Sequence, residues 1–204
     1  MMHPFPIKKI HFMDTIHIYT DGACSGNPGR GGYGAVLKCG AHTKELSGSF
    51  RKTTNNRMEL MAAIAALEAV RKEGSSIVLT SDSRYLTDAF NKGWLEGWKR
   101  NGYRKILNPD LWKRLAALTE RHDVTFLWVK GHAGHPENER CDALAVEAYT
   151  KDATAADREY EESPACLADR LEPLEILAGA FGEETAERIL SCLRRGGMEV
   201  TRKS

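Results

Sequence analysis

The chain has 204 residues, 42% of them hydrophobic and 28% charged, which is typical of a globular protein and excludes fibrous, collagen-like and wholly disordered classes. Its formal net charge of +1 is unevenly divided along the sequence. Residues 1–151 hold 22 Lys and Arg against 16 Asp and Glu, a net +6, whereas residues 152–204 hold 7 against 12, a net −5. The basic body favours a polyanionic partner, and the acidic tail needs an explanation of its own.

Neither a membrane segment nor a secretory signal is predicted. The longest apolar runs fall short of the roughly 18 residues that a span needs, and the first ten residues lack a small-residue cleavage site. The cysteines are odd in number and contain no CxxC pair; they are Cys24, Cys39, Cys141, Cys166 and Cys192. We therefore predict reduced thiols in a cytoplasmic protein.

The first half of the chain predicts three strands and a helix. Apolar alternation over residues 15–19 indicates a strand that reaches Asp21, and a glycine-dense loop is expected over residues 22–32. Two more strands, at 33–38 and 44–50, are joined by a short hairpin, so these strands should be antiparallel. Asn55 and Asn56 then offer an N-cap to a helix that Gly74 ends.

The second half alternates strands and helices. Residues 77–80 form a short apolar, β-branched segment that indicates a buried strand, and Asp82 ends it. The remaining expected elements are helical regions at 85–90 and 109–120, a strand at 124–129 and a helix at 136–149. Since strand-helix-strand crossovers make parallel neighbours, the first and fourth strands should lie side by side in a mixed sheet.

Residues 152–204 are predicted to form an acidic linker and a helical extension. Residues 152–162 are polar, and Ser163-Pro164 is typical of a helix start. Helices are expected at 163–179 and 183–195, and together they are too small to bury much core alone. The pair is expected to pack on the body, to bind a protein partner or to remain partly ordered. The predicted domains are an N-terminal extension (1–13), a catalytic domain (14–151) and this tail (152–204).

Four acidic residues are candidates for a metal site. Asp21 and Asp82 end neighbouring strands, Glu59 extends the sheet-facing stripe of its helix, and Asp142 lies on the last helix of the body. Two carboxylates about 4 Å apart repel by about 4 kcal/mol at an effective dielectric near 20, so a cluster favours a bound cation. All-oxygen ligands select Mg²⁺ or Mn²⁺. Taken singly, each residue also suits a turn, a cap or a solvated helix position.

Five segments carry a family resemblance, in unbroken order from about Met13 to Tyr149. They are TDGAC (20–24), NPG with GGYG (27–34), TTNNRMEL (53–60), TSDS (80–83) and WVKGHAGHPENERCD (128–142). Together they resemble the bacterial type 1 ribonuclease H family. The resemblance implies a ribonuclease H-like five-stranded mixed α/β sheet, with the first three strands antiparallel, the fourth and fifth parallel to the first, and helices on both faces.

The resemblance also implies an activity. The family's enzymes cut the RNA strand of an RNA/DNA hybrid by two-metal-ion hydrolysis, leaving 5′-phosphate and 3′-hydroxyl ends. By this likeness Asp21, Glu59, Asp82 and Asp142 would hold two Mg²⁺ ions, with Mn²⁺ as an alternative, and His132 would assist proton transfer or product release. The implied contacts to the hybrid involve Cys24, Asn27, Thr54, Asn55, Arg57, Trp94, Trp98, Lys99 and Arg100. A monomer is expected.

The sequence departs from the family pattern at two places, and two alternative functions remain open. Arg84 stands where the family more often has an uncharged polar residue, so it is a candidate partner of a phosphate or a carboxylate. The segment 102–109 is shorter and less lysine-rich than the family's basic protrusion, which bears on affinity for the hybrid. The alternatives are a nuclease of the same fold acting on DNA, and a hybrid-binding module without turnover.

Overall fold

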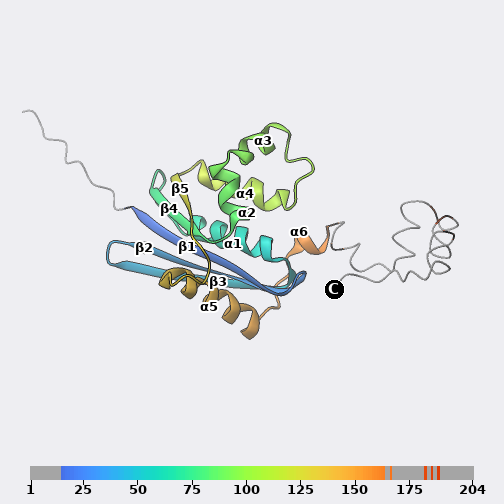
Figure 1. Ribbon diagram of the computed structural model, residues 1–204, viewed down its shortest axis with the longest axis horizontal. Helices are drawn as coiled ribbons and strands as arrows, with labels where there is room; N and C mark the ends of the chain where they lie inside the picture. The colour runs from blue at the N-terminus through green and yellow to red at the C-terminus, as the bar shows by residue number, and fades with distance from the viewer. Residues whose placement is uncertain (1–14, 164–165, 167–181, 183–184, 186–187, 189–204) are drawn as a thin grey trace, which may run out of the picture. The chain divides into compact units, whose positions relative to one another are not determined.

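The structure, a computed structural model, describes residues 15–163, 166, 182, 185 and 188 (Figure 1). These residues belong to two units, one that ends at Asp157 and one that begins at Arg158. The N-terminal extension and nearly all of the two helices predicted in the tail lie outside the described residues. Within the described part of the chain, no helix is long and apolar enough to cross a membrane.

The first unit is built on one five-stranded sheet in the order β3-β2-β1-β4-β5. The strands are β1 (Ile16–Gly26), β2 (Gly29–Cys39), β3 (His42–Thr53), β4 (Ser76–Ser81) and β5 (Asp123–Trp128). β1, β2 and β3 pair antiparallel, whereas β4 pairs parallel to β1 and β5 parallel to β4. The predicted mixed sheet, with the first and fourth strands adjacent at its centre, is confirmed.

Helices cover both faces of the sheet (Figure 1). They are α1 (Asn55–Glu68), α2 (Arg84–Asn91), α3 (Trp94–Arg100), α4 (Pro109–Thr119) and α5 (Pro136–Lys151). Two consecutive residues of β2 show which helix lies on which face. A Cβ atom on Gly31 would stand 3.0 Å from Met58 of α1, and one on Gly32 would stand 2.3 Å from the backbone of Ala145 in α5. Because successive strand residues point to opposite faces, α1 and α5 lie on opposite sides of the sheet.

The glycine-dense loop predicted over residues 22–32 is wrong. β1 continues to Gly26 and β2 begins at Gly29, so only Asn27 and Pro28 lie between the strands. The glycines are needed for a different reason, since helix backbones press directly on the strands at several of them. A Cβ atom on Gly34, for example, would stand 2.1 Å from the carbonyl oxygen of Cys141 in α5.

The main core lies between the sheet and α1, α2 and α4. Ile18, Ile64, Leu79 and Trp112 are fully buried there. The Trp112 ring packs edge-on against Trp98, with the ring centroids 5.0 Å apart. Burial of each large apolar side chain contributes about 1.5–3 kcal/mol, so this cluster is the main stabilising feature of the sheet and its helices.

The expected acidic linker begins as a segment bound to the first unit. The backbone N–H of Arg51 donates to the carbonyl of Ala155 at 2.8 Å, and the Thr53 hydroxyl donates to Asp157 at 2.6 Å. Residues 152–157 are therefore attached beside β3 and are not free. In the second unit, α6 (Arg158–Glu161) follows, and Ser163 Oγ accepts a hydrogen bond from the Cys166 backbone at 3.2 Å, as the predicted N-cap requires.

Candidate active site

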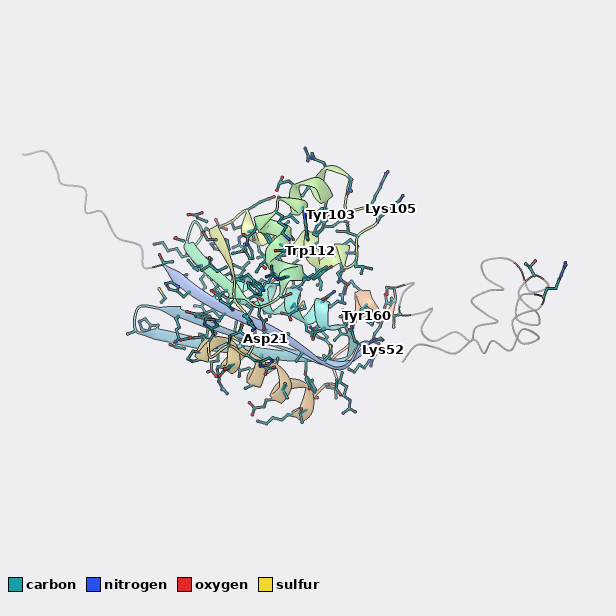
Figure 2. The ribbon with its side chains drawn as sticks, in the orientation of Figure 1. Asp21, Lys52, Tyr103, Lys105, Trp112 and Tyr160 are labelled. Atoms are coloured by element: carbon teal, nitrogen blue, oxygen red, sulfur yellow. The ribbon has the colours of Figure 1, made fainter. Side chains whose placement is uncertain are left out.

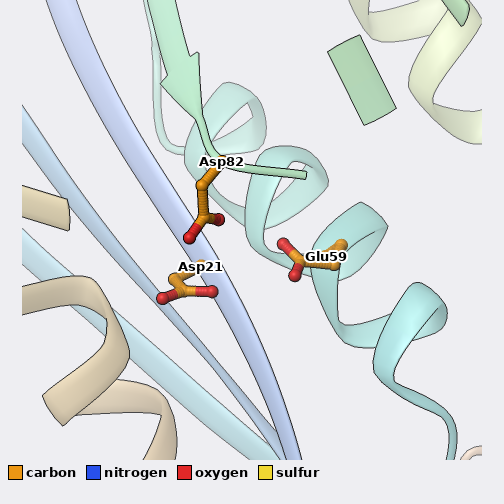
Figure 3. Close-up of side chains that lie close together, drawn as sticks. All are labelled: Asp21, Glu59 and Asp82. Carbon is orange, nitrogen blue, oxygen red and sulfur yellow. The ribbon is translucent and has the colours of Figure 1, made fainter. Parts of the chain in front are cut away.

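Three carboxylates converge where β1, β4 and α1 meet (Figure 3). Asp21 lies within β1, Asp82 directly follows β4, and Glu59 lies in the second turn of α1. One oxygen from each of the three lies within 4.8 Å of the others. The convergence that the sequence predicted for these three residues is present. The parallel pairing of β1 with β4 ends at Thr20 and Ser81, so the next residues, Asp21 and Asp82, lie side by side.

Close packing of α1 on β1 brings Glu59 to Asp21. A Cβ atom on Gly22 would stand only 2.4 Å from the backbone nitrogen of Glu59 and 2.5 Å from the carbonyl carbon of Met58. The first turns of α1 therefore rest on the backbone of the residue next to Asp21. A side chain at position 22 would force the helix, and Glu59 with it, away from the strand.

The cluster is electrostatically unfavourable by itself. Burial raises the pKa of Asp21 to about 7, with further increases from the charges of Asp82 and Asp142. Burial likewise raises the pKa of Glu59 well above its usual value, and the charges of Asp21 and Asp82 add to this effect. Glu59 Oε2 is buried and has no hydrogen-bond partner among the described residues. A divalent cation that prefers oxygen ligands would satisfy this oxygen and remove the repulsion, so the residues present fit such an ion.

Asp142, the fourth predicted ligand, lies apart from this group of three. It is in the second turn of α5, partly exposed, and its charge contributes to the raised pKa of Asp21. Its carboxylate is not among the oxygens that lie within 4.8 Å of one another. Asp142 thus acts on Asp21 through its charge, from a different helix. Its role as a metal ligand stays a prediction.

Two residues that were not predicted as site residues lie against the Asp82 side chain. The Asn138 side chain, only 3% exposed, donates from Nδ2 to Asp82 Oδ2 at 3.3 Å, while its own Oδ1 is buried and has no partner among the described residues. Gly131 is also close to this carboxylate, since an added Cβ atom would stand 2.4 Å from the same Oδ2. Both lie within the segment 128–142 that carries the family resemblance, but nothing in that segment indicates a contact with Asp82, about fifty residues earlier in the chain.

His132 lies on the exposed loop between β5 and α5. Its backbone φ is 50°, in the left-handed region that a residue with a side chain rarely adopts. It directly follows Gly131, whose backbone contacts the Asp82 carboxylate. The loop that carries His132 therefore passes close to Asp82, and the role of His132 in proton transfer stays a prediction.

The start of α1 gathers three of the predicted hybrid contacts. Thr54 is the N-cap residue, and its carbonyl accepts from the backbone of Met58 at 3.1 Å. The Asn55 backbone N–H donates to Asn27 Oδ1 at 3.1 Å, and Asn55 Nδ2 lies 3.4 Å from Glu59 Oε1. Asn27 and Asn55 are thus tied to each other and to a cluster carboxylate. Cys24 lies partly exposed on β1, and burial raises the pKa of its thiol to about 12, so it is a neutral group there.

Arg57 occupies a different environment from the one that a phosphate contact suggests. Its side chain is 3% exposed, and it donates to both oxygens of Asp157 at 2.6 and 2.7 Å and to both oxygens of Asp110 at 3.0 and 2.7 Å. Burial alone would lower the pKa of the guanidinium, but these hydrogen bonds raise it above its usual value. Two carboxylates already occupy this guanidinium, so a structural role accounts for Arg57 more directly than phosphate binding does.

The aromatic and basic residues of α3 divide between core and surface. Trp98 packs against Trp112 in the core, whereas Trp94 is 43% exposed. Lys99 pairs with Glu96 at 3.1 Å and with Glu120 at 3.0 Å, and Arg100 is exposed. Trp94 and Arg100 are therefore the members of this predicted group that are accessible to a ligand.

The chain matches known proteins over the region that holds this site. A family model described as RNase H matches residues 13–150, more than half of the chain. A protein named Ribonuclease H from Syntrophus aciditrophicus is 60% identical over 148 residues, which cover 70% of this chain and 85% of that protein. Ribonuclease HI from Synechocystis sp. is 52% identical over 153 residues, covering 72% of this chain and 95% of the relative.

Solved structures agree with these matches. LC9-RNase H1, described as a type 1 RNase H with the type 2 active-site motif, is 27% identical with a TM-score of 0.63, and the alignment covers 78% of this chain and 86% of that one. RNase H1 from the archaeon Halobacterium salinarum is 31% identical with a TM-score of 0.53, covering 68% of this chain and 99% of that one.

Proposed function

Because this chain belongs to the RNase H family, in its bacterial type 1 branch, we propose that it cuts the RNA strand of RNA/DNA hybrids by hydrolysis at a two-Mg²⁺ site. Family membership makes the chain an endoribonuclease that acts on such hybrids, and its acidic cluster suits the divalent metal ions on which the family depends. The choice of Mg²⁺ over Mn²⁺ and the pair of ions are our proposals. A monomeric state and a cytoplasmic location also stay predictions.

The observation that carries the mechanism is the convergence of Asp21, Glu59 and Asp82, with an uncompensated oxygen on Glu59. These residues, with Asp142 from α5, would hold the ions. When bound, such ions activate the attacking water and stabilise the leaving 3′-oxygen. His132, which directly follows Gly131 on the loop beside Asp82, would accept or return a proton. The products would then carry 5′-phosphate and 3′-hydroxyl ends.

Recognition of the hybrid requires contacts to 2′-hydroxyl groups, which distinguish RNA from DNA. Asn27 and Asn55 support this role because they are hydrogen-bonded to each other and Asn55 also reaches Glu59, so their polar groups are fixed beside the cleavage site. Thr54 at the start of α1 and the exposed Trp94 and Arg100 of α3 would contact the strands farther from the metals.

The test is digestion of RNA/DNA, RNA/RNA and DNA/DNA duplexes of one sequence with Mg²⁺. We expect cleavage of the RNA strand of the hybrid alone, and its loss after chelation with recovery on adding Mg²⁺. Asp21→Asn should remove at least two orders of magnitude of activity, since the cluster loses an ionised ligand. Asp123→Asn, an exposed residue at the start of β5, is the matched control and should retain activity. Cleavage of DNA/DNA, or full activity in Asp21→Asn, would overturn the proposal.

A further inference from the structure

Arg84 places a cation beside the carboxylate cluster without pairing with it. It is the first residue of α2, two positions after Asp82, and its side chain is exposed. Among the described residues, no Asp or Glu lies within ion-pair distance of its guanidinium, although three carboxylates gather nearby. The positive charge is therefore free for a ligand, in contrast to that of Arg57.

The guanidinium is held instead by an aromatic ring. Arg84 Cζ lies 3.8 Å from the ring centroid of Trp128, the last residue of β5. Trp128 is in turn fixed to the metal site, because its Nε1–H donates to the backbone carbonyl of Asp82 at 2.8 Å. Stacking on an aromatic face holds the flat guanidinium in one orientation while its edge remains available for hydrogen bonds.

Helix stability does not explain this arginine. The N-terminal end of a helix carries partial positive charge, so a cation at its first position is unfavourable there. The cap of α2 is made by Ser83, whose Oγ accepts from the Leu86 backbone at 3.4 Å. The helix end and the guanidinium both favour an anion at this place, next to a site that acts on a polyanion.

We propose that Arg84 binds a backbone phosphate of the RNA strand within one or two nucleotides of the cleaved bond, with Trp128 as its support. The proposal rests on the hybrid as the substrate. Two Cα steps separate Arg84 from Asp82, at most about 7.6 Å, and a strand presents a phosphate for every ~3.4 Å of helix axis. The forked guanidinium matches two phosphate oxygens, which a lysine cannot do in the same way.

The first test compares Arg84→Gln and Arg84→Lys with Arg121→Gln, an exposed arginine that pairs with Glu73. Arg121 lies two residues before the start of β5, whereas Trp128 is the last residue of that strand. Arg121 is therefore a charge-matched control at the end of β5 that lies far from the metal site. We expect Arg84→Gln to raise KM for the hybrid about 5–20-fold at low salt and to change kcat less than about twofold. The slope of log KM against the logarithm of the salt concentration should fall by about one. Arg84→Lys should fall between it and the wild type.

The second test locates the phosphate. In a series of hybrids, a single uncharged 2′-deoxy methylphosphonate linkage is placed at successive positions of the RNA strand. Each control hybrid has a 2′-deoxy nucleotide with an ordinary phosphate at the same position. One linkage near the cleaved bond should remove the difference in KM between wild type and Arg84→Gln. A fall in kcat with unchanged KM, an equal effect of Arg121→Gln, or a KM difference that no linkage removes would overturn the proposal. Hybrid cleavage by the wild type, lost in Asp21→Asn, reports on the proposed function separately.

Discussion

Arg57 donates hydrogen bonds to both carboxylate oxygens of Asp157, at 2.6 and 2.7 Å, although the two residues are 100 positions apart in the chain. The side chains are 3% and 6% exposed, so this is a buried ion pair. It joins the start of α1, where Asn55 and Glu59 lie, to a residue beyond the end of α5.

We expect Asp157→Ala to destabilise the protein by about 3–5 kcal/mol, because removal of one partner leaves part of a buried charge uncompensated. The free energy of unfolding from urea titration measures the effect. Asp123→Asn, which changes an exposed carboxylate, should have an effect below about 0.5 kcal/mol. Equal stabilities of Asp157→Ala and the wild type would show that Asp110 alone suffices to compensate Arg57.

Gly22→Ala should reduce both stability and activity, because its Cβ atom would stand 2.4 Å from the backbone of Glu59. Overpacking of this kind typically costs about 1–3 kcal/mol, and the displaced helix would carry Glu59 away from Asp21. Gly97→Ala is the matched control, since a Cβ atom there meets nothing within 4 Å and the residue lies inside α3. Thermal unfolding and hybrid cleavage are the measurements, and a fully active Gly22→Ala would contradict the argument.

Asn138→Ala should lower kcat/KM by about 10–100-fold and raise the Mg²⁺ concentration needed for half-maximal activity. Residues that orient metal ligands commonly have effects of this size, and Asn138 is hydrogen-bonded to Asp82 at 3.3 Å. Glu139→Ala, an exposed change at the next position of α5, serves as the control. If both variants show the same metal titration as the wild type, Asn138 has no part in positioning Asp82.

His122 predicts a stability that depends on pH. Its side chain is 8% exposed, both ring nitrogens lack partners among the described residues, and burial lowers the pKa of the imidazole, with a further decrease from Arg121 and an opposing increase from Glu73. A folded-state pKa below the unfolded value of about 6.5 means that stability is fully present above that pH and is lost as pH falls through the folded pKa.

Replacing this histidine should therefore remove the acid sensitivity. We expect His122→Leu to be more stable than the wild type at pH 5, with a smaller difference at pH 8, as measured by urea titration at both values. His42→Leu, an exposed change on β3, should leave the pH dependence of stability as it is in the wild type. The same difference between His122→Leu and wild type at both pH values would refute a contribution from this imidazole.

The topology and the three converging carboxylates could be predicted from sequence because both follow from local patterns. Strand alternation, helix spacing and the crossover rule place β1 beside β4, and Asp21 and Asp82 directly follow the residues at which this pairing ends. Glu59 lies on the apolar stripe of α1, so its direction toward the sheet also follows from periodicity.

What the sequence did not predict depends on contacts between distant segments. Asp157 looks like part of a polar linker because its partner, Arg57, is 100 residues earlier. Asn138 is polar and fully ordinary for a first helical turn, yet it is buried against Asp82. The glycines of β1 and β2 suggest a loop by their density, whereas they are required by helices that approach the strands closely. Trp94 and Trp98 belong to the same aromatic and basic sequence pattern, and only the packing of Trp98 on Trp112 distinguishes the core residue from the exposed one.

The attachment of residues 152–157 has a consequence for how the protein behaves at high concentration. β3 is the outermost strand on its side of the sheet, and its Arg51 N–H group is paired with Ala155. An unpaired outer strand is a template on which another molecule can add a strand and begin to aggregate. A fragment cut after Lys151 would uncover this part of β3, so we expect it to self-associate where a fragment that extends past Asp157 does not, as light scattering would reveal.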